Sequence, residues 1–148
     1  MSKTIERTIE IDRSPEQVWQ VLSDLPKYPD WNPFIRHIEG SLKVGEKLRV
    51  HIAPNGKKGM KFRPTVTSAT APSSLTWIGK LGVRGLFDGE HRFTLRDMGA
   101  GRTSLTQGET FTGVLVSLFG GGLEATAEGF DQMNRALKER CEGMSSRG

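Results

Sequence analysis

The chain has 148 residues, which is enough for one domain with a hydrophobic core of its own but not for two large ones. Its single cysteine, Cys141, excludes an internal disulfide, and no Cys and His residues recur at the spacing of a zinc site, so we expect neither a metal nor a cofactor. A net charge of +4, from 21 Lys and Arg against 17 Asp and Glu, is too small to indicate a nucleic-acid partner.

The first residues of the chain are charged and lack the apolar run of a signal peptide. Nowhere do about 18 apolar residues follow one another, as a membrane-spanning helix requires. We therefore expect a cytoplasmic protein that contacts membranes at most transiently. The sequence leaves the oligomeric state open.

Residues 4–11, TIERTIEI, alternate between apolar and polar side chains, which is the two-residue period of a half-buried strand. Arg7 is the exception, because it interrupts the apolar face. Further on, Ser14 and Gln17 have the spacing of a capping box, and Pro15 suits the first position of a helix. This part of the sequence predicts a strand followed by a short helix.

The segment 24–34, DLPKYPDWNPF, combines three prolines with three aromatic residues. Proline removes backbone donors, so the segment is too broken for a long regular element. We expect a bent helix or loop that turns Tyr28, Trp31 and Phe34 inward. Two short helices would then lie between the first strand and the second.

Six further strand candidates follow, separated by clusters of Gly, Pro, Asn, Asp or Ser that favour tight turns. They span residues 34–39, 46–53, 59–70, 74–81, 86–96 and 103–112. Together with the first strand they predict a seven-stranded antiparallel sheet built as a meander of hairpins.

A long helix is expected at the C-terminal end. The glycines 120–122 break the chain, and apolar residues then recur at helical spacing, namely Leu123, Ala127, Phe130, Leu137 and Cys141. A sheet with one apolar face and a helix with one apolar stripe need each other as cover, which predicts an α+β fold with a curved sheet around the helix. We assign residues 1–142 to this domain and residues 143–148 to a frayed tail.

Several of these motifs occur together in one known superfamily. They are Ile9-Glu10-Ile11, Ser14-Pro15-Glu16-Gln17-Val18-Trp19, the stretch 24–33, Leu75-Thr76-Trp77-Ile78-Gly79 and the glycine-rich start of the last helix. In this order, and over nearly the whole chain, they resemble the START-like or SRPBCC superfamily of polyketide cyclases, dehydrases and lipid-transport proteins. The resemblance implies a helix-grip fold with a cavity between sheet and C-terminal helix for lipids, sterols, quinones, polyketides or hormones. It implies no single activity, because one fold hosts many functions.

Two of the predicted strands carry polar side chains on their inward face. His91 shares its parity with the apolar residues of strand 86–96, and Gln107 and Glu109 share theirs with the apolar residues of strand 103–112. These three side chains therefore point toward the interior and form the predicted polar end of the cavity.

The expected pairing of these two strands follows from a turn at 97–102. It places His91 opposite Gln107 and Gly89 opposite Glu109, and a slip by two residues would leave the faces unchanged. In the resembled fold the first strand lies beside the last, which makes Arg7 a candidate partner of Glu109, because an unpaired buried charge is costly. The sequence leaves open whether the two residues pair with each other or with water in the cavity.

The polar cluster has two interpretations. It is either a structural ion pair with a satisfied histidine, as buried polar groups usually are, or a set that orients a ligand in an apolar pocket. With the large inward apolar side chains, the predicted ligand-binding residues are Arg7, Trp31, Phe34, Val50, Phe62, Trp77, His91, Phe93, Gln107, Glu109, Phe111, Phe119, Leu123, Phe130 and Met133. For each apolar member, plain core packing is the stronger explanation. Gly79 and Gly89 on the inward face would leave room for a ligand.

The expected function is binding, and in some settings transport, of a small hydrophobic ligand such as a lipid, quinone or polyketide. One alternative is an enzyme of cyclase or dehydratase type in which His91 moves protons and Glu109 orients or assists it. A second alternative is a protein or membrane partner module that uses the basic hairpin residues Lys57, Lys58, Lys61 and Arg63.

Overall fold

The computed structural model describes residues 2–53, 59–80, 88–113 and 120–143, with the side chains of the last helix described from residue 124 onward. In chain order the elements are β1 (Ser2–Ile11), α1 (Pro15–Ser23), the 3-10 turn η1 (Leu25–Lys27), α2 (Tyr28–Trp31), β2 (Ile35–Glu39), β3 (Arg49–Ile52), β4 (Met60–Phe62), β5 (Thr65–Thr70), β6 (Ser74–Lys80), β7 (Asp88–Gly99), β8 (Arg102–Thr112) and α3 (Gly120–Glu142).

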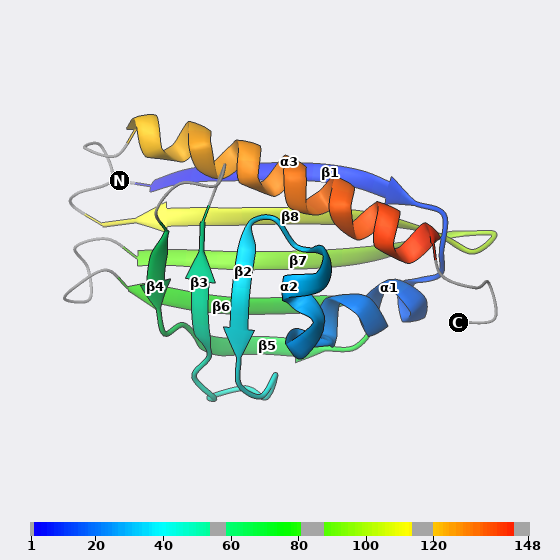
Figure 1. Ribbon diagram of the computed structural model, residues 1–148, viewed down its shortest axis with the longest axis horizontal. Coiled ribbons are helices and arrows are strands. Elements are labelled where there is room, and N and C mark those ends of the chain that lie inside the picture. Colours follow the sequence, from blue (N-terminus) through cyan, green and yellow to red (C-terminus); the bar gives the residue numbers. More distant parts are fainter. Residues whose placement is uncertain (1, 54–58, 81–87, 114–119, 144–148) are drawn as a thin grey trace.

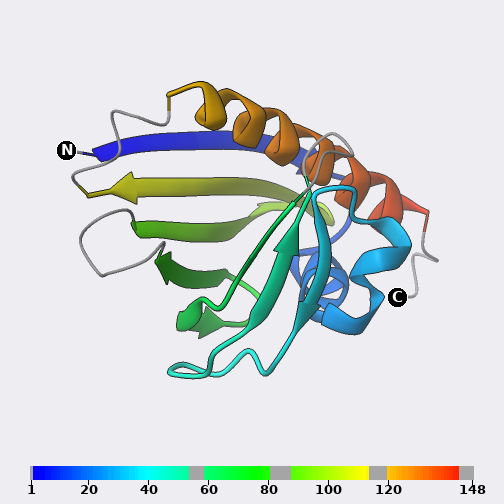
Figure 2. The same ribbon diagram turned by 60° about the vertical axis from the view of Figure 1, so that its left-hand side comes forward.

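The described strands form two antiparallel sheets. Five strands in the order β1-β8-β7-β6-β5 form the larger sheet, and α3 packs along it beside β1 and β8 (Figure 1). The smaller sheet, β2-β3-β4, stands at an angle to the larger one, and α1 and α2 lie together at one end of the molecule (Figure 2). The predicted α+β fold, a curved antiparallel sheet around a long C-terminal helix, is confirmed.

The strand count differs from the prediction, because the expected strand 59–70 is two strands, β4 and β5. Pro64 lies between them and has no backbone N–H to continue a ladder. Its carbonyl oxygen instead accepts a hydrogen bond from the backbone N–H of Leu48 at 2.8 Å, and the Val66 N–H donates to Glu46 at 2.9 Å. The chain therefore turns a corner at Pro64 and passes from the smaller sheet into the larger one.

Local side-chain chemistry forms the expected short helices. Ser14 caps α1 and completes a capping box with Gln17, and Pro15 occupies the first turn. The Tyr28 hydroxyl donates to the carbonyl oxygen of Leu22 at 2.6 Å, which ties α2 to α1, and burial raises the pKa of this phenol well above its usual value. Asn32 Oδ1 then accepts from the backbone N–H groups of Phe34 and Ile35 and so starts β2.

The hairpin of β7 and β8 closes more tightly than expected. Ala100 and Gly101 form its turn with φ of 56° and 73°, and the register shifts between Asp97 and Gly99. Paired positive φ values are typical of two-residue hairpin turns. The predicted pairing of His91 with Gln107 is therefore wrong by two residues, because His91 lies opposite Glu109.

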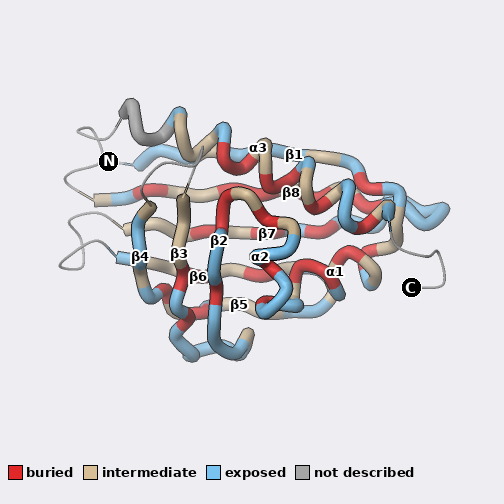
Figure 3. The backbone as a smooth tube through the Cα atoms, in the orientation of Figure 1, coloured by how far each residue is buried: buried red, intermediate tan, exposed pale blue. Residues whose placement is uncertain are grey.

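The helix α3 begins at Gly120, so the three glycines form its first turn and do not break the chain. Its C-terminal half is packed into the core through Phe130, Met133, Leu137 and Cys141, all without exposed surface. In Figure 3 the buried stretches lie along the middle of the larger sheet and the C-terminal half of α3. No helix in the described part of the chain is long and apolar enough to cross a membrane.

Candidate functional site

A line of buried polar groups crosses from the larger sheet to α3. His91 Nε2 lies 2.9 Å from Gln107 Oε1, and Gln107 Nε2 lies 2.8 Å from Asn134 Oδ1. Asn134 Nδ2 is 3.2 Å from the backbone carbonyl oxygen of Arg7, and His91 Nδ1 is 3.3 Å from Glu109 Oε1. We call this set, from Glu109 to the Arg7 carbonyl, the polar chain.

The direction of each hydrogen bond in the polar chain follows from its last member. The Arg7 carbonyl can only accept, so Asn134 donates from Nδ2 and presents Oδ1 to Gln107. Gln107 then donates from Nε2 and presents Oε1 to His91, which must carry a proton on Nε2. A backbone atom thus fixes the protonated nitrogen of a histidine on another strand.

The pair of His91 and Glu109 has a place for one further proton. A hydrogen bond between Nδ1 and Oε1 needs a proton on one of the two atoms, since an unprotonated nitrogen and a carboxylate oxygen both only accept. When the pair holds such a proton, it lies between Oε1 and Nδ1 and leaves Oε2 as an acceptor.

Aromatic rings enclose the histidine. The Trp77 ring stacks on His91 with centroids 5.2 Å apart and an interplanar angle of 23°. Phe130 meets it edge-on at 5.0 Å, and Phe93 lies at 4.8 Å. His91 is only 2% exposed as a result, so its two hydrogen-bond partners replace water.

Glu109 is the member of the polar chain that reaches toward the outside, with a side chain 16% exposed. Among the described residues, no group forms a hydrogen bond with its Oε2 atom, which lies too close to Gly89 for a β-carbon to stand there. Gly79 and Gly89 were expected to leave room for a ligand. At Gly89 that space is taken by the carboxylate.

The sequence suggested Arg7 as a partner of Glu109, but in the structure Arg7 pairs with Asp131 instead. β1 is the edge strand next to α3, and the Arg7 side chain extends toward that helix, where its Nε lies 3.3 Å from Asp131. The guanidinium is 44% exposed, so it needs no buried acid. Within β1 and β8, Arg7 lies opposite Gln107 and Ile5 lies opposite Glu109.

The structure brings together only part of the predicted ligand-binding set. Trp77, Phe93 and Phe130 surround His91, and Phe34 packs edge-on against Phe130 with ring centroids 5.6 Å apart. Met133 is fully buried in the same core, and Phe111 is almost fully buried on β8. These side chains fill the interior around the middle of α3, so any open space lies elsewhere.

Other predicted residues lie apart from the polar chain. Trp31 lines a cleft of 540 Å³ with residues of α1, α2 and the C-terminal end of α3. Val50 and Phe62 belong to the smaller sheet and line a second groove. Phe119, Lys57 and Lys58, and the side chain of Leu123, lie outside the described residues.

Asn134 was missed in the sequence, although a signal for it exists. It is 2% exposed and sits among the buried residues Phe130, Met133, Leu137 and Cys141 of α3. A polar residue at that helical spacing faces the core and needs a partner there. Among the described residues, no three His, Cys, Asp or Glu side chains lie close enough together to hold a metal ion.

Three solved structures similar to this one share its fold. A START superfamily protein from Mycobacterium smegmatis has a TM-score of 0.74 at 21% identity, covering 96% of this chain and 99% of its own. The ZhuI aromatase/cyclase from Streptomyces sp. R1128 has a TM-score of 0.76 at 18% identity, with 96% and 94% covered. Norcoclaurine synthase from Thalictrum flavum, in complex with dopamine and hydroxybenzaldehyde, has a TM-score of 0.71 at 14% identity, with 98% and 90% covered.

Comparisons of the sequence alone give one match, which is to a family model. Searching the curated proteins by sequence gives no match. The model of one family, however, matches residues 2–142, which is nearly the whole chain. This protein belongs to the polyketide cyclase / dehydrase and lipid transport family.

Proposed function

We propose that the protein binds a small, mostly apolar molecule between the larger and the smaller sheet, beyond the filled core under the middle of α3, and that Glu109 Oε2 holds the polar group of that molecule. The observation that carries this proposal is an oxygen atom to which the described part of the chain offers no hydrogen bond, at the outer end of a polar chain whose other members have partners. Mostly apolar pockets commonly fix a ligand through a few such polar atoms.

The placement of the ligand follows from the gradient of burial. Around His91 the core is closed, whereas Ile52 and Phe62 on the inward face of the smaller sheet and Glu109 on β8 are only partly buried. In Figure 1, β4 lies toward the end of the larger sheet that is remote from α1. The proposed ligand enters from that end and stops at the aromatic rings around His91.

The chemistry of Oε2 selects the ligand. Because a proton held by the pair would lie at Oε1 or Nδ1, Oε2 is an acceptor with or without that proton. The ligand must therefore present a donor, such as a phenol, enol, alcohol or amine, on an apolar skeleton. A hydroxylated polyketide or lipid meets this requirement, and an oxidised quinone without a hydroxyl group does not.

A direct test compares hydroxylated probes with their methyl ethers, which keep the skeleton and lose the donor. We would measure binding of 2-naphthol, a hydroxylated flavone and a long-chain alcohol, each with its methyl ether, by calorimetry and native mass spectrometry. At least one hydroxylated probe should bind tenfold or more tightly than its ether, about 1.4 kcal/mol. The preference should disappear in Glu109→Gln and persist in Glu46→Gln, which removes an exposed carboxylate elsewhere.

Two results would count against the proposal. If neither the hydroxylated probes nor their methyl ethers bind, the proposed apolar site does not exist. If a hydroxylated probe and its ether bind the wild-type protein equally well, the protein has an apolar site, but Glu109 Oε2 does not recognise the donor of the ligand.

A second candidate function is proton-transfer catalysis of the cyclase or dehydratase type. It is favoured by the shared proton beside a free carboxylate oxygen, because Oε2 can accept a proton from an enolisable carbon while the pair redistributes the charge. The test is exchange of the α-hydrogens of 2-tetralone in D₂O, followed by NMR. Exchange at the buffer rate with the wild-type protein would reject catalysis and leave ligand binding untouched.

A further inference from the structure

The outer face of the smaller sheet carries charged side chains in two rows across its strands. In one row, Glu39 on β2 lies opposite Arg49 on β3. In the next, His37 lies opposite His51, which in turn lies opposite Lys61 on β4. All five side chains alternate with inward-facing residues of the same strands, so they share the outer face.

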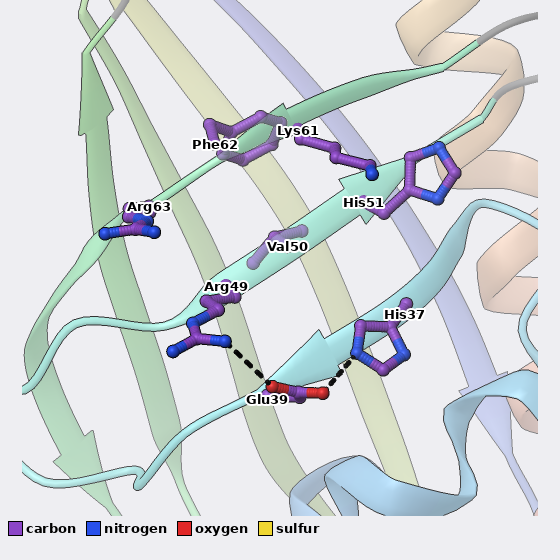
Figure 4. A pocket seen from close by; sticks show the side chains of 8 residues that line it. All are labelled: His37, Glu39, Arg49, Val50, His51, Lys61, Phe62 and Arg63. Carbon is purple, nitrogen blue, oxygen red and sulfur yellow. Dashed lines mark hydrogen bonds and ion pairs between the residues drawn. The ribbon is translucent and has the colours of Figure 1, made fainter.

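Positive charge in these rows has little compensation. Of the described residues that line the groove, only Glu39 is acidic. Its Oε1 lies 2.7 Å from His37 Nε2, while Arg49 Nη1 is 3.7 Å from its other oxygen. Lys61 and Arg63 have no acidic partner within the described part of the chain. Arg49 on β3 and Arg63, which directly follows β4, line the same side of the groove in Figure 4, although like charges side by side repel one another.

These side chains border a hollow and not a flat surface. A groove of 440 Å³ is lined by His37, Glu39, Arg49, Val50, His51, Lys61, Phe62 and Arg63. In Figure 4 the basic side chains come from both β3 and β4, and Lys61 and His51 approach one another at the far end from Arg49. An anion in the groove would meet cations from two strands at once, which offsets their mutual repulsion.

We propose that this groove binds the phosphate groups of a soluble phosphorylated molecule. Arginine suits such a ligand because its planar guanidinium donates two parallel hydrogen bonds to phosphate oxygens. A hollow with cations on both sides fits a small polyanion that enters it, whereas a membrane would meet protruding side chains. The charged side chains of the groove are separate from the polar chain, because no hydrogen bond joins the two sets among the described residues.

The test uses inorganic pyrophosphate, titrated into the wild-type protein at moderate salt and followed by calorimetry and by amide shifts in NMR. The double variant Arg49→Gln/Arg63→Gln should bind it at least tenfold more weakly. Arg96→Gln removes one exposed positive charge from β7, remote from the groove, and should bind as the wild-type protein does. The shifts should be confined to β2, β3 and β4.

A second readout separates loss of the site from loss of the fold. Without pyrophosphate, Arg63→Gln should unfold at the same or a higher temperature than the wild-type protein, because it relieves a repulsion. Pyrophosphate should raise the unfolding temperature of the wild-type protein and not that of the double variant.

The proposal is overturned if pyrophosphate fails to bind, or if Arg96→Gln weakens binding as much as the groove variants do. It is also overturned if the protein binds phosphatidylglycerol vesicles through Arg49 and Arg63 but ignores pyrophosphate, since the surface then recognises a membrane. None of these outcomes depends on the apolar ligand.

Discussion

Gly89 on β7 leaves the space that the Glu109 carboxylate of β8 occupies. The two residues are diagonal neighbours, because Glu109 lies opposite His91 and Gly89 lies opposite Phe111. A β-carbon at position 89 would collide with Glu109 Oε2, which is the free end of a flexible side chain. The glycine is thus part of the site although it contributes no side chain.

Replacing Gly89 with alanine should therefore weaken binding of a hydroxylated ligand more than it weakens the fold. The backbone at Gly89 is not in the left-handed region, and the carboxylate can move aside. We expect a loss of tenfold or more in affinity with a small change in the free energy of unfolding. In a Glu109→Ala background the same substitution should have no further effect on affinity, and a full additional loss there would contradict the model.

Breaking the polar chain at Asn134 should destabilise the protein. Asn134→Leu removes the acceptor of Gln107 Nε2 and the donor to the Arg7 carbonyl in a buried setting. Buried polar groups left without partners cost about 1–3 kcal/mol each. Urea unfolding measures this loss, and Arg135→Leu, an exposed neighbour on the same helix, serves as the control.

The direction of the polar chain can be observed directly. Nitrogen-15 NMR of the imidazole should find a proton on His91 Nε2 in the wild-type protein. In Asn134→Leu the Gln107 amide is free to turn over, and the Nε2 proton should no longer be fixed. A wild-type protein without a proton on Nε2 would show that the chain runs in the opposite direction.

Gly129 should resist replacement by alanine despite its place inside a helix. Helix propensity alone predicts a gain of about 1 kcal/mol for this change. A β-carbon there would run into the Phe34 ring, which is fully enclosed and packed edge-on against Phe130. Overpacking of this kind costs about 1–3 kcal/mol, so thermal unfolding should show a net loss. A Phe34→Ala background should restore the gain.

Acid sensitivity should depend on Glu142 at the end of α3. Its Oε2 accepts from Lys138 Nζ at 2.6 Å and from the backbone N–H of Asp12 at 2.8 Å, and these bonds lower the pKa of the carboxyl below its usual value of 4.5. The stabilisation is therefore complete above pH 4.5 and is lost as the pH falls through the folded value. Glu142→Gln should lower stability at pH 7 and flatten its decline below pH 4.5, and Glu46→Gln should not.

The sequence predicted the faces of the site better than its contacts. Strand parity alone placed His91, Gln107 and Glu109 on the inward face, because a side chain's face repeats every two residues. The register of the two strands depends on where the turn between them lies, and the sequence did not show its position. A left-handed conformation at Ala100 is unusual for a residue with a β-carbon. The tighter turn moved Glu109, in place of Gln107, opposite His91.

Other parts of the site depend on tertiary contacts that no local pattern contains. Arg7 has inward parity, yet α3 passes beside its strand and offers Asp131 at the surface. The split of β4 from β5 had a visible sign in Pro64, but the partner that takes up the freed pairing, Leu48, comes from a loop far along the chain. The enclosing rings around His91 likewise come from three separate elements.

The polar chain ends at the backbone carbonyl of Arg7, and this limits which substitutions homologous sequences can carry. Because residue 7 contributes only its carbonyl oxygen, the side chain at that position can change freely without reversing any hydrogen bond. Positions 107 and 134 have no such freedom, since each must donate on one side and accept on the other. Homologues that keep the same histidine should therefore vary at position 7 and carry an amide, or another side chain that both donates and accepts, at positions 107 and 134.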